Sequence, residues 1–343
     1  MEDSISRTST LIHPGTGVRI DTPLLVPSFS SKGFHIRTDG TSEVQDILRA
    51  SGEFITESYL ISAYDIHYKH IPPPKDLPFR PNVIVLDSGG YEISKDRDLS
   101  EVSDPVPGKN GWNHDMLRSV LDVWPKEYAT ILVSYDHPDE HRSFVEQVEL
   151  AREVFRSRHD HLHTLLLKPE SKNQYTLKTV LKAAVADIAE LRSFDIIGLT
   201  QKELGPSIIE QMVWIARFRK ELDTAGIKAP IHIFGSLDPL TVCLFFIAGA
   251  EIFDGLTWMR YAYRDGQCVY VDNAAVLGDL GLEFNHNFVR LQTMRNNIVA
   301  LQKLAVQIRE FQFTGEFAKL PHGERIRSAL DSLRTHLAKG GKH

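Results

Sequence analysis

The sequence predicts an α/β fold, a (β/α)8 TIM barrel followed by a C-terminal helical extension. Eight short β-rich runs recur between Leu24 and Leu256 at roughly 29 residues per unit, and a barrel of eight strand–helix units usually takes about 250 residues. Several runs, such as residues 83–86 and 165–167, are continuously apolar. Continuous apolar runs are typical of parallel strands that are buried on both faces.

The predicted strands alternate with segments of helical periodicity. We expect the strands at residues 24–31, 54–60, 83–90, 130–136, 163–169, 195–200, 230–236 and 250–256. The clearest helices cover residues 141–158, 177–192 and 207–224, and the last of them stops at Gly226. A doubly wound open sheet is the alternative, but the chain has no glycine-rich dinucleotide fingerprint.

The chain is expected to form two domains. Residues 1–270 would form the barrel and carry catalysis, and residues 271–343 would form a helical extension packed on it. Within the extension we expect helices at about 287–313 and 323–339. A long insertion after the third strand includes the turn-forming residues 104–108 (DPVPG).

Composition and charge exclude several classes of protein. The 343 residues carry 39 Lys and Arg against 45 Asp and Glu, a net charge of -6, which excludes a basic coat over the whole surface but not a local basic groove. Cys243 and Cys268 provide neither a disulfide framework nor a multi-cysteine zinc site. The N-terminus has no signal-peptide pattern, and the most apolar stretch, residues 239–250, is too short to span a bilayer. We therefore expect a cytoplasmic protein without membrane contact, bound metal or cofactor.

Three acidic side chains lie where predicted strands end. Asp87, Asp136 and Asp254 occupy the carboxyl ends of three different runs, although strands disfavour aspartate. In barrels of this class the functional groups lie at that end. Each aspartate alone could be a helix cap or a turn residue. Together they indicate a pocket where one carboxylate attacks an electrophilic carbon, another moves protons, and a third accepts hydrogen bonds from a ligand rich in N–H groups.

Other residues at the same strand ends are candidates for ligand binding. Gly89 and its neighbour Gly90 allow the backbone to approach a ligand closely. Tyr91 could stack on a flat base, or it could pack in the mouth of the barrel. Lys168 ends the fifth run, where a lysine could also form an imine with a carbonyl substrate.

Five motifs follow one another in a fixed order. They are residues 87–92 (DSGGYE), 134–136 (SYD), 198–203 (GLTQKE), 253–260 (FDGLTWMR) and 286–288 (HNF). In order and content they resemble the motifs of the tRNA-guanine transglycosylase family: DSGG-aromatic-Gln, the base-recognising aspartate, GLAVGE, FDxxxPTR and HNL. The resemblance extends roughly from Pro23 to Val306.

The resemblance implies an enzyme that exchanges a purine in a nucleic acid for a 7-deazapurine without breaking the backbone. Asp254 would attack C1′ of the target nucleoside and form a covalent glycosyl-enzyme intermediate. Asp87 would protonate the departing base and deprotonate the incoming one. Asp136 would hold the Watson–Crick edge of a base flipped into the pocket.

The resemblance also implies the residues that bind substrate. Tyr91 and Phe234 would sandwich the base, and Arg260, with Arg264, would hold the flanking backbone. The full implied set is Asp136, Tyr91, Ser88, Gly89, Gly198, Leu199, Phe234, Gly235, Lys168, Arg260 and Arg264. The implied partners are tRNA or DNA and a free purine or 7-deazapurine base, with a homodimer or a partner protein left open.

The chain departs from the family pattern in three places. The family's zinc motif, C-x-C-x-x-C with a distant His, is missing, since only Cys268 lies between Gly266 and His286. Lys168 stands where a glutamine is expected, and Glu92 replaces the glutamine after the aromatic residue. These departures leave open the base and the polymer. Two alternatives also remain: a non-catalytic nucleic-acid-binding or partner subunit of a transglycosylase, and a Schiff-base lyase that uses Lys168.

Overall fold

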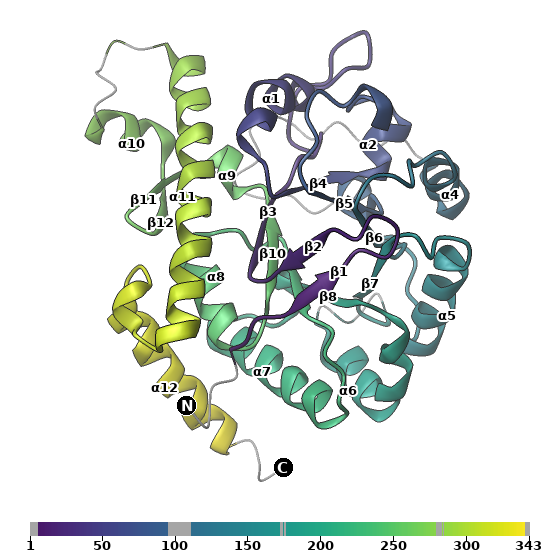
Figure 1. Ribbon diagram of the computed structural model, residues 1–343, viewed down its shortest axis with the longest axis vertical. Helices are drawn as coiled ribbons and strands as arrows, with labels where there is room; N and C mark the ends of the chain where they lie inside the picture. Colours follow the sequence, from purple (N-terminus) through teal and green to yellow (C-terminus); the bar gives the residue numbers. More distant parts are fainter. Residues whose placement is uncertain are drawn as a thin grey trace.

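A computed structural model of the chain describes residues 6–94, 111–171, 174, 176–278, 283 and 285–339, and it contains a barrel of eight parallel strands (Figure 1). The strands are β3 (Leu24–Pro27), β4 (Ser58–Ser62), β5 (Val83–Asp87), β6 (Thr130–Val133), β7 (Leu162–Leu167), β8 (Ile196–Thr200), β9 (Ile231–Phe234) and β10 (Ile252–Gly255). From β4 to β10 each strand pairs with the next along the chain, and β10 pairs with β3. A parallel bridge between Ser28 and Leu60 joins β3 to β4 and closes the ring. The predicted TIM barrel is confirmed.

Helices surround the barrel. They are α1 (Glu43–Ser51), α2 (Ala63–His67), α3 (Gly90–Ile93), α4 (His114–Asp122), α5 (Phe144–Phe155), α6 (Lys178–Ala186), α7 (Ile208–Thr224), α8 (Pro239–Ile247) and α9 (Thr257–Arg260). The expected helix at 141–158 is shorter because Ser143 caps α5, with Glu146 completing a capping box. The expected helix at 207–224 is confirmed as α7, and Gly226 follows it with φ +70°, a left-handed stop.

Alternate residues of the strands divide the core into two layers. One layer fills the barrel and includes Leu24, Val26, Val83, Val85 and Ile252. The intervening strand residues pack outward against the helices, as Leu25, Ile84 and Leu86 do. This alternation decides which side chains at the strand ends point into the barrel.

An N-terminal hairpin that the sequence analysis did not predict covers the amino ends of the strands. It consists of β1 (Thr10–Ile12) and β2 (Arg19–Asp21), which pair antiparallel. Ile20 joins the apolar cluster inside the barrel, and the Nε2 atom of His13 lies 2.9 Å from the backbone N of Thr130 at the start of β6. The hairpin therefore leaves the carboxyl ends as the accessible mouth.

The C-terminal helices share the core of the barrel. After the hairpin of β11 (Ala262–Arg264) and β12 (Gln267–Val269) come α10 (Val271–Leu277), α11 (His286–Thr314) and α12 (Gly323–Lys339). The long helix α11 runs beside the barrel, and its residues Met294, Ile298, Leu301 and Ile308 belong to the main apolar cluster (Figure 1). The two tail helices are confirmed, while the expected boundary at residue 270 stays a prediction.

Most of the observed strands end earlier than the runs that the sequence predicted. The third run was expected to continue to residue 90, but β5 ends at Asp87, and the fourth was expected to reach residue 136, but β6 ends at Val133. Residues 88–89 and 134–136 instead form loops at the barrel mouth, and residue 90 begins α3. The expected insertion at residues 104–108 lies outside the described residues.

Candidate functional site

Two buried carboxyl groups face into the barrel at its open end. Asp87 is the last residue of β5 and shares the inward face of Val83 and Val85, while Asp254 on β10 shares the inward face of Ile252. Asp87 is 8% exposed and Asp254 is 6% exposed. A burial this deep costs free energy unless each carboxyl group is hydrogen-bonded, so the partners of each define the site.

Three donors hold the carboxylate of Asp254. The hydroxyl of Ser28 donates to Oδ2 at 2.7 Å, and the backbone N–H of Gly235 donates to Oδ1 at 3.3 Å. The Nε2 atom of His232 lies 3.1 Å from Oδ1. Because a carboxylate oxygen accepts, this nitrogen is the protonated one. The carboxylate is therefore fixed in one orientation, with both oxygens contacted.

Asp87 has a strongly perturbed acidity. Its Oδ2 accepts a hydrogen bond of 3.1 Å from the backbone N–H of Gly89. Burial, reinforced by the nearby charges of Asp136 and Asp254, raises the pKa of Asp87 to about 7. A carboxyl group of this acidity can both give and take a proton near neutral pH.

The loop after Asp87 requires its two glycines. Gly89 has φ +98°, and a Cβ there would lie 2.7 Å from Cβ of Tyr64. A Cβ at Gly90 would lie 2.3–2.4 Å from the carboxyl atoms of Asp136. The glycine pair thus lets the loop turn and brings Asp136 directly over its backbone.

Asp136 is held at the mouth by the same loop. The hydroxyl of Ser88 donates to its Oδ1 at 2.5 Å. The other oxygen, Oδ2, lies 4.0 Å from Nζ of Lys168. The structure thus brings Asp87, Asp136 and Asp254 together at one end of the barrel, where the charges of the other two act on Asp87.

Lys168 follows β7 and is paired rather than free. Its Nζ donates to Oε1 of Glu203 at 2.7 Å and to the hydroxyl of Thr200 at 3.3 Å. Burial alone would lower the pKa of Lys168, but the charges of Glu203 and Asp136 outweigh burial and raise it. The amine is therefore protonated near neutral pH and presents a charged donor beside Asp136.

The predicted base-binding residues of β8 and β9 lie close together. Phe234 is 8% exposed, and its ring stacks on that of His232 with 3.8 Å between the centroids. A Cβ at Gly198 would lie 2.7 Å from Cε2 of Phe234, so glycine makes room for this ring. The side chain of Leu199 packs outward in the helix-facing core, which leaves only its backbone for the mouth.

Tyr91 lies at the mouth on α3 among basic groups. The Nζ atom of Lys32 lies 4.4 Å from the centre of the Tyr91 ring and also donates to the Tyr91 carbonyl at 3.0 Å. The guanidinium of Arg260 lies 3.4 Å from the Tyr91 hydroxyl and is only 9% exposed. Arg264 on β11 is more accessible, with 42% of its side chain exposed.

Glu92 forms a second buried acidic centre next to Asp87. It accepts hydrogen bonds from the hydroxyls of Ser30 at 2.5 Å and Ser62 at 3.0 Å. Burial, followed by the charges of Asp65 and Asp87, raises the pKa of Glu92 well above its usual value. Glu92 stands where the resemblance gives a glutamine, and serine hydroxyls hold both of its carboxyl oxygens.

Sequence reasoning missed the residues that hold the acidic groups, namely Ser28, His232, Ser30 and Ser62, and also Glu203, which holds Lys168. A signal for His232 exists in the sequence, since it lies two residues before Phe234 and so shares the inward face of β9. The serines come from other strand ends that are far away in the sequence.

The residues present do not fit the zinc site of the family. Among the described residues no three His, Cys, Asp or Glu side chains are grouped closely enough to hold a metal ion. Cys243 is buried in α8, and Cys268 lies on β12. In the part of the chain that the structure covers, every helix is too short or too polar to cross a membrane.

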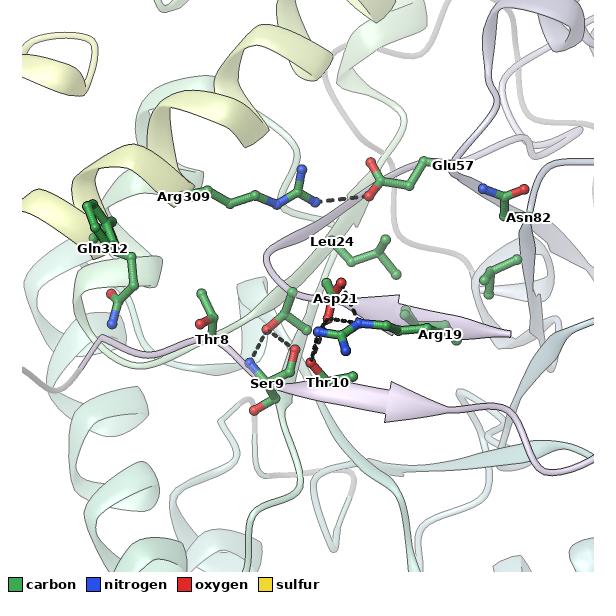
Figure 2. Close-up of a pocket in the computed structure, with 14 residues that line it drawn as sticks. Thr8, Ser9, Thr10, Arg19, Asp21, Leu24, Glu57, Asn82, Arg309 and Gln312 are labelled. Atoms are coloured by element: carbon green, nitrogen blue, oxygen red, sulfur yellow. Dashed lines mark hydrogen bonds and ion pairs between the residues drawn. The ribbon is translucent and has the colours of Figure 1, made fainter. Parts of the chain in front are cut away.

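A cavity of about 720 Å³ lies at the opposite end of the barrel (Figure 2). The first hairpin, α11 and the amino ends of β3 and β5 line it. Its charged side chains pair with one another, Arg309 with Glu57 at 2.9 Å and Arg19 with Asp21 at 2.9 Å. The acidic cluster of Asp87, Asp136 and Asp254 lies at the other end of the barrel from this cavity.

No family model matches this chain. The tRNA-guanine(15) transglycosylase of Haloferax volcanii is 24% identical over 286 residues, which are 81% of this chain and 51% of that protein. The chain thus spans about half the length of this curated relative. The chain is therefore distantly similar in sequence to this transglycosylase.

Proposed function

We propose that this protein is a glycosyltransferase that replaces a guanine in a nucleic acid with a 7-deazapurine through a covalent intermediate on Asp254. The observation that carries the proposal is the pairing of two carboxyl groups inside one barrel mouth. Asp254 is held by Ser28, His232 and Gly235, and Asp87 has its pKa raised to about 7. One group is oriented for attack and the other is suited to proton transfer.

In the first half-reaction a carboxylate oxygen of Asp254 attacks C1′ of the flipped nucleoside. A bond forms between C1′ and the oxygen, and the bond from C1′ to the base breaks. Protonated Asp87 gives its proton to the departing base. In the second half-reaction the incoming base loses a proton to Asp87 and takes C1′ from Asp254. Two displacements retain the configuration at C1′.

The donors and acceptors at the mouth fit the edge of a guanine-like base. Asp136 would accept from the N1–H and N2–H groups, and the charged Nζ of Lys168 would donate to O6, in the role that the resemblance gives to glutamine. Backbone groups at Gly198 and Leu199 would complete this contact. Tyr91 would cover one face of the base and Phe234 the other.

The two alternative functions find less support. A partner subunit without activity has no need of two buried carboxyl groups in one barrel mouth, because their burial is costly. A Schiff-base lyase needs an unprotonated lysine, and the raised pKa of Lys168 disfavours one. Both tRNA and DNA remain candidate polymers, and a second copy of the chain or a partner protein could assist binding.

Incubation with labelled guanine and either tRNA or DNA tests the proposal. We expect one polymer to retain the label after denaturation and removal of free base, and excess unlabelled 7-deazaguanine to compete. Boiled protein is the control. Failure of both polymers to take up label, over a range of sequences, would contradict the proposed function.

Attachment of the polymer is expected to depend on a few exposed cations, among them Arg264 on the β11–β12 hairpin. Arg264→Ala should weaken binding to all sequences alike. The slope of log K against log salt concentration should become shallower by about 0.7–0.9, which corresponds to the loss of one phosphate contact. Arg260 is a poorer test than the sequence implied, because its buried guanidinium contacts the Tyr91 hydroxyl and the Lys32 carbonyl. Binding titrations at several salt concentrations measure the slope.

The matched control is Arg19→Ala. Arg19 is also exposed, but it pairs with Asp21 at the opposite end of the barrel. The Arg19→Ala protein should keep the slope of the parent. An Arg264→Ala protein with the slope and affinity of the parent would show that this side chain does not contact the polymer.

A further inference from the structure

His232 is a buried titratable side chain in direct contact with the proposed nucleophile. It lies on the inward face of β9 and is 1% exposed. Its Nε2 lies 3.1 Å from Oδ1 of Asp254, and its ring stacks under Phe234. Its other nitrogen, Nδ1, is buried and has no hydrogen-bond partner among the described residues.

The lack of a partner for Nδ1 among the described residues indicates that packing alone does not explain a histidine at this position. A buried polar atom without a partner destabilises a fold, and most of the side chains that fill this barrel are apolar. A leucine or phenylalanine at position 232 would fill the space without that cost. Among the described residues, the hydrogen bond to Asp254 is the contact of His232 that requires a donor side chain.

The two oxygens of Asp254 are contacted unequally. Oδ1 accepts from the two N–H donors of His232 and Gly235, at 3.1 and 3.3 Å, while among the described residues Oδ2 accepts from the Ser28 hydroxyl at 2.7 Å. A hydroxyl can rotate away from its acceptor more readily than a ring or backbone N–H, so Oδ2 would be the oxygen that attacks C1′. After the attack Oδ1 is the carbonyl oxygen of the ester, and it still faces two N–H donors.

We propose that His232 is a positioning residue that acts on Asp254 and sets the lifetime of the glycosyl–enzyme ester, an inference that rests on the proposed function. When the ester breaks, the C1′–Oδ2 bond is lost, the incoming base nitrogen bonds to C1′, and its proton goes to Asp87. The electron pair of the broken bond returns to the carboxylate. His232 gives up no proton; its N–H stabilises the returning charge through Oδ1, as a donor aimed at developing charge does.

His232→Leu and His232→Gln test this role with the full chain and the polymer that the wild type labels. His232→Leu loses the N–H donor. Breakdown of the ester should therefore slow by about ten- to a hundredfold, which is the rate effect of losing one hydrogen bond to a charged group. The adduct should therefore accumulate while KM for the base changes little. The amide nitrogen of glutamine reaches the position of Nε2, so His232→Gln should restore most of the rate.

The measurement is the amount of covalent adduct and the rate of label exchange in the same quenched reactions. His163→Leu is the matched control, because His163 lies on β7, stacks on Phe155 and contacts none of the mouth carboxylates. It should behave as the wild type. If His232→Leu does not fold, His232→Asn replaces it, since the shorter amide cannot reach the position of Nε2.

Two negative results are distinguishable. An adduct that forms and breaks down equally fast in the wild type and in His232→Leu would overturn the role of His232 and leave the proposed function standing. Absence of any adduct in the wild type with either polymer would contradict the proposed function itself, and the inference with it.

Discussion

Asp254→Asn is expected to abolish covalent trapping of nucleic acid and to lower base exchange by about 10⁴–10⁶-fold, the usual effect of removing a nucleophile. The amide has nearly the shape of the carboxylate but is far less nucleophilic. The amide nitrogen Nδ2 replaces one of the two carboxylate oxygens, and it cannot accept a hydrogen bond. The variant therefore loses the hydrogen bond from Ser28 or the one from the Gly235 N–H, depending on which oxygen is replaced. Binding of the polymer without free base should change little.

Denaturing gels of reactions with labelled polymer detect the adduct, and label exchange gives the rate. Asp21→Asn is the matched control, because Asp21 is an exposed aspartate that pairs with Arg19 at the closed end of the barrel. That variant should trap and exchange as the wild type does. Wild-type exchange by Asp254→Asn would show that the nucleophile is another group.

The barrel could be predicted from sequence because its signal is local and repeated. Each strand is a short apolar run, and the runs recur at a regular spacing. The hairpin of β1 and β2 could not be predicted in the same way. Its strands have three residues each, and they are held by contacts such as that of His13 with Thr130, 117 residues away. Such pairings leave no periodic trace in the sequence.

The reactive acids could be predicted, but the residues that position them could not. Aspartate is rare in strands, so Asp87 and Asp254 stood out at strand ends. Ser28 is 226 residues from Asp254, and a serine after a strand has many ordinary uses. The identity of the base contacts also stays a prediction. Phe234 is largely buried and stacked on His232, a packing that the sequence alone does not indicate.

Asp87→Asn is expected to stabilise the protein, because the charged carboxylate of Asp87 destabilises the folded state. The same substitution is expected to slow base exchange by about 10²–10⁴-fold. Burial first, and then the charges of Asp136 and Asp254, raise the pKa of Asp87 from 3.8 to about 7. Between those two values the folded chain holds a proton that the unfolded chain has lost. Stability that depends on this group therefore falls as pH rises through that window and is constant above about pH 7.

The amide introduced by Asp87→Asn does not titrate, so the gap in unfolding free energy between this variant and the wild type should grow as pH rises from 5 to 7. Above pH 7 the variant should be more stable by about 1–4 kcal/mol, given about 1.4 kcal/mol per pKa unit. Urea unfolding of both proteins at pH 5, 6, 7 and 8 measures the gap, and the titrating groups that do not interact with Asp87 cancel in the difference. If the two proteins had the same unfolding free energy, or if their difference were equal at pH 5 and pH 8, the barrel would not hold Asp87 in its neutral form. Asp87 would then not be suited to proton transfer near neutral pH.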